Sequence, residues 1–137
     1  MSINLIVPIS RLPVDFWEFQ KVAEAKFSEI EKEIALKFSR LKSSDADDLE
    51  SGFVEIQGSS PDDWCLLSFA WLEQAAREDN ESDLNYYASV STRGKKRFSA
   101  ILISSLSAFG ARMVYDDSHF FGENDKLNIS NLTEVKE

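Results

Sequence analysis

The sequence predicts an α+β protein in which a mixed sheet of four or five strands carries two helices packed on it. Three observations indicate this: strand-like apolar segments, a long helical stripe that starts at Phe16, and a strand–helix–strand pattern over residues 84–115. The 137 residues are 43% hydrophobic, enough for one packed core. We therefore expect a single globular domain over 1–137, whose polar tail after Asp116 need not be ordered.

The N-terminal half predicts a strand followed by a long helix. INLIVPI, residues 3–9, is apolar and partly β-branched, and Pro8 favours an edge position or an early end for this strand. The spacing predicts a helix from about Pro13 to Leu41, about 40 Å long, that lies across the sheet. Its stripe follows intervals of three and four residues and comprises Phe16, Phe19, Ala23, Phe27, Ile30, Ile34, Phe38 and Leu41.

The middle of the chain is partly ambiguous. Residues 42–52 are polar and predict a loop, and FVEIQ, residues 53–57, alternates as a half-buried strand does. Segment 61–77 has two interpretations. Ser60-Pro61-Asp62-Asp63 is a typical helix start, whereas WCLLSFAWL, 64–72, could be a strand that forms a hairpin with 84–92. Both interpretations leave the neighbouring acidic stretch at the surface.

The third quarter predicts a β-α-β unit. LNYYASVST, 84–92, alternates and is rich in aromatic residues, so it is a predicted strand. A helix over about 95–109 should end at Gly110 in the left-handed conformation, and a further strand should follow at 111–115. The two strands could lie parallel, joined by a right-handed crossover.

Charge is strongly sorted along the chain. Residues 43–83 contain twelve acids and one base, a charge of −11, whereas residues 84–115 contain five bases and no acid. The whole chain carries −9, with a pI near 4.6. This disfavours nucleic acid and anionic membranes as partners, because both need clustered Lys and Arg. An acidic block instead suits a basic protein partner.

Several classes of site are disfavoured. A single cysteine, Cys65, and a single histidine, His119, allow no intrachain disulfide and no ordinary structural zinc site, so we expect neither metal nor cofactor. Cys65 lies among apolar residues, which favours a buried structural thiol. The chain shows neither a signal peptide pattern nor a membrane-spanning stretch, which predicts a cytoplasmic protein.

Two polar clusters are alternative sites. Thr92-Arg93-Gly94-Lys95-Lys96-Arg97 lies where a strand passes into a helix, and Arg93, Lys95, Lys96 and Arg97 could bind an anion there. More simply, these bases could offset the neighbouring acidic block. Asp116, Asp117 and His119 could support metal binding or acid–base chemistry, but a polar turn after the last strand explains them more simply.

In its size, acidity and strand–helix–strand ending in VYDD, without a catalytic motif, the chain resembles the immunity proteins of bacterial polymorphic-toxin and contact-dependent inhibition systems. The resemblance implies a cytoplasmic, non-enzymatic antitoxin, monomeric or homodimeric, that covers a cognate and basic toxin domain. An anion-binding domain or enzyme, an adaptor, and a DNA-mimicking inhibitor are the alternatives. The residues expected to contact the partner are Asp45, Asp47, Asp48, Glu50, Trp71, Glu78, Asp79, Glu81 and Asp83.

Overall fold

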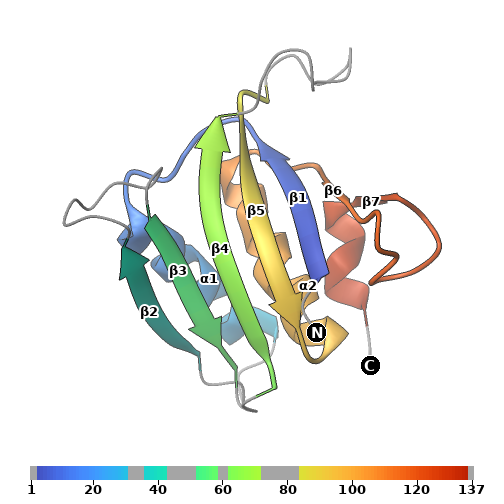
Figure 1. The fold of residues 1–137 in the computed structure, drawn as a ribbon, viewed down its shortest axis with the longest axis horizontal. Helices are drawn as coiled ribbons and strands as arrows, with labels where there is room; N and C mark the ends of the chain where they lie inside the picture. The colour runs from blue at the N-terminus through green and yellow to red at the C-terminus, as the bar shows by residue number, and fades with distance from the viewer. Residues whose placement is uncertain (1–2, 31–35, 43–51, 59–61, 72–83, 136–137) are drawn as a thin grey trace.

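The computed structural model describes residues 3–30, 36–42, 52–58, 62–71 and 84–135 (Figure 1). The elements, with η marking 3-10 helices, are β1 (Ile3–Ile9), α1 (Phe16–Ile30), β2 (Lys37–Lys42), β3 (Gly52–Gln57), β4 (Trp64–Trp71), β5 (Tyr86–Arg93), α2 (Lys96–Ser104), η3 (Ser105–Phe109), β6 (Met113–Tyr115), β7 (Lys126–Asn128) and η4 (Ile129–Glu134).

The α+β class is confirmed, but the sheet is larger than expected. In the described part it has seven strands in the order β2-β3-β4-β5-β1-β6-β7. The two strands that the sequence did not predict, β2 and β7, are the outer ones. All described pairings are antiparallel, so the expected mixed sheet is wrong. Figure 1 shows the helices gathered on one face, which leaves the other face without a helix across it.

The long N-terminal helix is much shorter than the stripe predicted. α1 ends at Ile30, and Lys37–Lys42 form β2, which pairs with β3 and places Phe38 opposite Ile56. The apolar residues at 38 and 41 fit the helical spacing by coincidence. Residues 37–42 form hydrogen bonds with the edge of β3 that faces away from β4. These sheet hydrogen bonds replace the last turns of the expected helix.

Residues 64–71 form a strand, so the strand interpretation of segment 61–77 is confirmed for these residues and the helix interpretation is wrong. β4 pairs with β3 on one side and β5 on the other, so both of its edges are satisfied by hydrogen bonds. Cys65, Leu67 and Phe69 are buried on its inner face. Its outward positions include Trp64, Leu66 and Ala70, so the segment is apolar at most positions, which is why its periodicity was ambiguous.

β1 lies inside the sheet, so the edge position expected from Pro8 is wrong. β1 pairs with β5 along its whole length, whereas its described pairing with β6 is limited to Ile6 opposite Tyr115. Pro8 lies beyond that short pairing. One side of β1 therefore has no strand partner at Pro8, and its missing N–H group is tolerated there.

The expected unit over 84–115 is present with one change. β5 and β6 each pair antiparallel with β1, so they run in the same direction but have β1 between them. The helix that joins them is α2 followed by the 3-10 turn η3, and Gly110 ends it at φ +90°, as the sequence predicted. The tail beyond Asp116, expected to be weakly structured, forms β7 and η4.

The core lies between the inner face of the sheet and the helices. Phe19 is fully buried, with its ring centroid 5.8 Å from that of Phe69 on β4 and 6.5 Å from that of Phe109 on η3. Phe27 and Phe98 bring α1 and α2 together in the same way, at 5.9 Å. The helical stripe was therefore correctly assigned to the core as far as Phe27.

Candidate functional site

The acidic residues expected at an interface follow strands that end at one side of the sheet. β2 and β4 run in the same direction, since each is antiparallel to β3. The chain therefore leaves the sheet after Lys42 and after Trp71 at the same end, toward the left and the top of Figure 1 respectively. Trp71 pairs with Tyr86, and nothing is described of its side chain. The other candidates lie outside the described residues, at Asp45, Asp47, Asp48, Glu50, Glu78, Asp79, Glu81 and Asp83.

We call this side of the sheet the acidic end. It is defined by residues 10–17, by Phe53, and by the points where segments 43–51 and 72–83 join the strands. The two segments carry nine acids and one base, a charge of −8. The described part of the chain has three exposed large hydrophobic side chains, and all belong to this end: Val14 at 83%, Trp17 at 50% and Phe53 at 40% exposure.

The sequence analysis did not identify the exposed apolar residues at this end. Val14 lies in the link that follows β1, Trp17 in the first turn of α1, and Phe53 at the start of β3. A usable signal exists for Trp17, because it lies off the helical stripe to which Phe16 and Phe19 belong. Large aromatic side chains that remain exposed beside charged segments are typical of protein interfaces.

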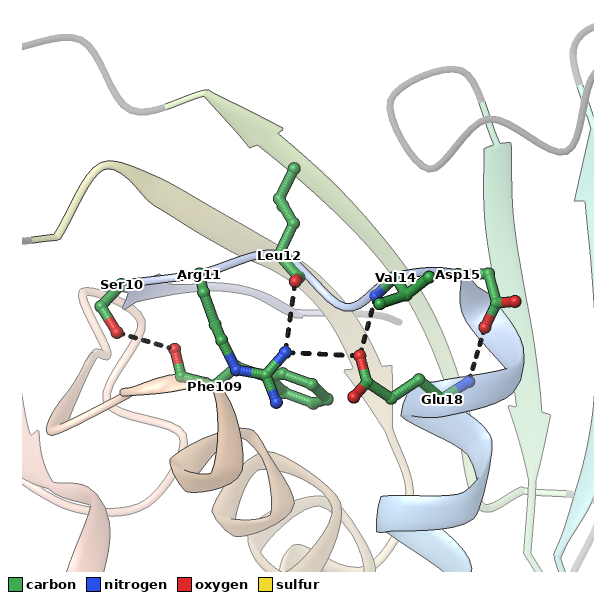
Figure 2. A network of polar contacts seen from close by, with 7 residues as sticks. All are labelled: Ser10, Arg11, Leu12, Val14, Asp15, Glu18 and Phe109. Carbon is green, nitrogen blue, oxygen red and sulfur yellow. Dashed lines mark hydrogen bonds and ion pairs between the residues drawn. The ribbon is translucent and has the colours of Figure 1, made fainter.

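A network of polar contacts fixes the link between β1 and α1 at the acidic end (Figure 2). The Asp15 carboxylate accepts the Glu18 N–H at 2.8 Å, and the Glu18 carboxylate accepts the Val14 N–H at 2.8 Å and the Arg11 guanidinium at 3.3 Å. The Val14 N–H first and the Arg11 guanidinium second hold the pKa of Glu18 below its ordinary value. The arrangement resembles a capping box, except that Glu18 accepts the N–H of Val14, one residue before Asp15, and the spacing Asp15-x-x-Glu18 could have predicted it.

Arg11, a base at the acidic end, already has partners within the chain. Besides contacting Glu18, its guanidinium lies 4.7 Å from the centroid of the Phe109 ring. The backbone N–H groups of Ser10 and Arg11 both donate to the Phe109 carbonyl, at 3.0 and 3.3 Å. Arg11 therefore anchors the link to η3, and its charge is shared with Glu18.

The basic turn lies at the other end of the sheet. β5 begins beside segment 72–83 and ends at Arg93, and eight extended residues place these points about 23 Å apart. Charges exposed to water are screened over about 8 Å at physiological ionic strength. The bases at 93–97 therefore lie well beyond this screening length from the point where segment 72–83 joins β5, although they are its neighbours in sequence.

An internal carboxylate occupies the start of α2. Asp63 is 5% exposed, and its Oδ1 accepts the Lys95 backbone N–H at 2.9 Å. Gly94, at φ +96°, permits this approach, because a Cβ atom there would lie 2.5 Å from both the Asp62 carbonyl and Asp63 Oδ1. The anion expected at this helix start is thus supplied by the chain itself.

Two of the four bases in this turn also have internal contacts. The Arg93 guanidinium lies over the Trp64 ring, 5.2 Å from its centroid. Arg97 donates to the carbonyls of Val135 at 3.0 Å and Thr133 at 3.4 Å, which ties α2 to the end of η4. Lys95 and Lys96 are exposed. The contacts of Asp63, Arg93 and Arg97 give this turn a structural role that needs no external ligand.

The structure does not bring the side chains of Asp116, Asp117 and His119 together. Asp116 is fully buried, and its two carboxylate oxygens accept the N–H groups of Phe120 and Phe121, each at 2.8 Å. Asp117 is exposed, and His119 Nε2 lies 2.7 Å from Asp125 Oδ1. No group of three potential metal ligands occurs among the described residues. Asp116 therefore shapes the turn that precedes β7.

Replacing Asp116 with alanine should lower the free energy of unfolding by about 2–3 kcal/mol, because two N–H groups of a tight turn lose a charged acceptor. Urea denaturation followed by circular dichroism would measure this. Asp117→Ala is the matched control and should change stability by less than about 0.5 kcal/mol. Equal effects of the two substitutions would contradict the structural role of Asp116.

Cys65 is buried in the inner face of β4, as the sequence predicted. Burial in apolar surroundings raises the pKa of its thiol far above the ordinary value. The thiolate needed for nucleophilic chemistry is therefore strongly disfavoured, which supports a packing role for this residue.

No helix in the described ranges is long and apolar enough to cross a membrane. Comparisons with protein-family models, with curated proteins and with solved structures find no match for this chain.

Proposed function

We propose that this chain is a protein-binding immunity protein, an antitoxin that neutralises a cognate basic toxin domain in the cytoplasm through its acidic end. The observation that carries the proposal is the meeting of two features at that end. Two connections with a combined charge of −8 join the sheet there, and all three exposed large hydrophobic side chains of the described part belong to the same end.

The charge at this end has little internal compensation in the described part. Arg93 and Arg97 lie at the opposite end with contacts of their own, and Arg11 is shared with Glu18. Such a charge would steer a basic partner toward this end and raise the association rate. The exposed ring of Trp17 would then supply the desolvated contact that slows dissociation.

The contacts of the basic turn favour this function over an anion-binding enzyme. Asp63 already accepts the N–H at the start of α2, where an anionic substrate would have to bind. The hypothesis of an enzyme that uses Arg93–Arg97 therefore gains no support from the geometry. The charge of the acidic end has little compensation in the described part of the chain, and it therefore supports binding of an external partner.

The test begins with capture of the partner from the native host at low salt, identification by mass spectrometry, and binding kinetics with the purified partner. Reversing three acids, Asp79→Lys, Glu81→Lys and Asp83→Lys, should slow association about tenfold at low salt, and the effect should shrink at high salt. Trp17→Ala should instead raise the dissociation rate about tenfold or more.

The matched control reverses three exposed acids away from the acidic end: Glu29→Lys, Glu123→Lys and Glu134→Lys. It changes the net charge by the same amount, so it separates local steering from total charge. An equal loss of association rate in both triple variants would count against the acidic end. Recovery of growth when this chain is co-expressed with the captured protein would establish neutralisation, and continued toxicity would refute it.

A further inference from the structure

We propose that Glu18 is a positioning residue of the acidic end, which holds Val14 and Trp17 in one exposed arrangement for contact with an apolar part of the partner. We call Val14 and Trp17 the apolar pair. The inference rests on the proposed function, because the occupant is the same basic protein. It adds a residue that acts through its neighbours, and a contact that does not depend on charge.

Val14 is exposed at a position where an apolar side chain is normally packed. Asp15 caps α1, since its carboxylate accepts the Glu18 N–H, so Val14 directly precedes the cap. An apolar residue at that position often packs against the fourth residue of the helix, here Phe19, in a hydrophobic staple. Val14 is instead 83% exposed, while Phe19 is fully buried against β4. A site where a local rule is broken in this way is a candidate for function.

Trp17 adds a large ring to the same exposed surface. It lies in the first turn of α1, three residues after Val14, and half of its surface is in water. The Lys21 amino group lies over the ring, 5.4 Å from its centroid, and this contact helps to orient the indole. Exposed aromatic side chains of this kind are common anchors in protein interfaces.

The link that carries Val14 is held at both of its ends. At the β1 end, the N–H groups of Ser10 and Arg11 donate to the Phe109 carbonyl. At the helix end, Glu18 Oε1 accepts the Val14 N–H at 2.8 Å and the Arg11 guanidinium at 3.3 Å (Figure 2). One carboxylate oxygen therefore joins both halves of the link. A link held in this way loses little conformational freedom on binding, which favours affinity.

The charged side chains around the apolar pair already have contacts within the chain. Arg11 pairs with Glu18, and the Asp15 carboxylate accepts a backbone N–H. Lys21 lies over the indole ring. Two bases and two acids cancel in formal charge, so this part of the acidic end offers apolar contact without net charge. We therefore expect apolar side chains of the partner to face it, while the acidic segments contribute to steering.

The positioning role can be measured in the purified chain. Glu18→Ala removes the acceptor of the Val14 N–H, whereas Glu18→Gln keeps an acceptor oxygen and removes the charge. In ¹⁵N heteronuclear NOE spectra, the amides of Val14 and Asp15 should be as rigid as those of Phe19 and Ala23 in the native chain and in Glu18→Gln. They should become mobile in Glu18→Ala, while Phe19 and Ala23 stay rigid. An unchanged NOE at Val14 in Glu18→Ala would overturn the proposal.

Binding kinetics with the captured partner test the role at the interface. Glu18→Ala should raise Kd about fivefold, and equally at low and high salt, because the lost contact is apolar. Glu18→Gln should stay within about twofold of the native chain, since an exposed ion pair contributes little. Glu29→Ala is the matched control, because it removes a carboxylate from an exposed position of the same helix, and it should also stay within about twofold.

A double-mutant cycle shows whether Glu18 acts through the apolar pair. When Val14→Ala and Trp17→Ala are already present, adding Glu18→Ala should change Kd by less than about twofold. An undiminished effect in that background would overturn the positioning role. Equal losses for Glu18→Gln and Glu18→Ala would also overturn it, because they would show that Glu18 acts through its charge.

The same measurements separate this inference from the proposed function. A partner that binds the native chain and the Val14→Ala, Trp17→Ala variant equally well would overturn the inference alone. A captured partner that is not toxic would contradict the proposed function, whereas the double-mutant cycle would still decide the role of Glu18. Failure to capture any protein at low salt would count against both.

Discussion

Replacing Phe19 with alanine is expected to lower the free energy of unfolding by about 4 kcal/mol, as is typical when a fully buried aromatic side chain is truncated. Phe19 is fully buried and its ring lies between Phe69 of β4 and Phe109 of η3. Truncation removes the apolar area and also leaves a cavity that rigid neighbours on a strand and a helix turn cannot close. Urea denaturation followed by circular dichroism measures the loss.

The control for this prediction is Trp17→Ala, which truncates a larger ring on the same turn of α1. Trp17 is half exposed, so its removal should cost less than about 1 kcal/mol. Similar losses for the two variants would mean that α1 does not pack on the sheet through the face that contains Phe19. The same measurement shows that Trp17→Ala is folded, as its use in binding kinetics requires.

Gly110→Ala is expected to cost about 3 kcal/mol or more, through two separate effects. Gly110 has φ +90°, a conformation that costs an L-residue about 1–2 kcal/mol. A Cβ atom there would also clash with the Ser10 side chain, on the segment that follows β1. The backbone around Ser10 is held by its N–H bond to the Phe109 carbonyl, so the clash cannot be relieved cheaply.

The two effects can be separated with a second substitution. Ser10→Gly removes the clashing side chain, so the double variant should regain the steric part of the loss and keep the conformational part. Gly122→Ala is the matched control, because a Cβ atom there meets nothing within 4 Å, and its effect should be within about 0.5 kcal/mol. A neutral Gly110→Ala would show that α2 and η3 do not end against β1 as described.

Local pattern was sufficient for the class of the fold and for most strands. Residues 3–9, 53–57 and 84–92 alternate or run apolar as strands do, and Gly110 marked the end of a helix. The prediction from hydrophobic spacing failed where the same residues fit both the helical period of 3.6 and the strand period of 2. Phe38 fits both a helical stripe and the inner face of β2, and a decision between them depends on the hydrogen bonds that β3 offers from a distant part of the sequence.

Placement of charge required the structure. Segment 72–83 and the bases at 93–97 are neighbours in sequence, yet β5 carries the chain from one end of the sheet to the other between them. Asp63 begins no helix of its own and instead accepts the N–H of Lys95, which directly precedes α2 and is 32 residues away. Contacts over such sequence separations leave no periodic signal, whereas Asp15-x-x-Glu18 does, because both residues lie within one helical turn.

The central position of β1 has a consequence for biosynthesis. β1 is the first strand to be made, but its neighbours in the sheet, β5 and β6, are residues 86–93 and 113–115. Until they emerge from the ribosome, the apolar β1 and the Phe-rich α1 have no completed sheet to cover. Closure over this separation is slow, which exposes the nascent chain to chaperones and aggregation. We therefore expect the chain to reach its folded form only some time after its translation is complete.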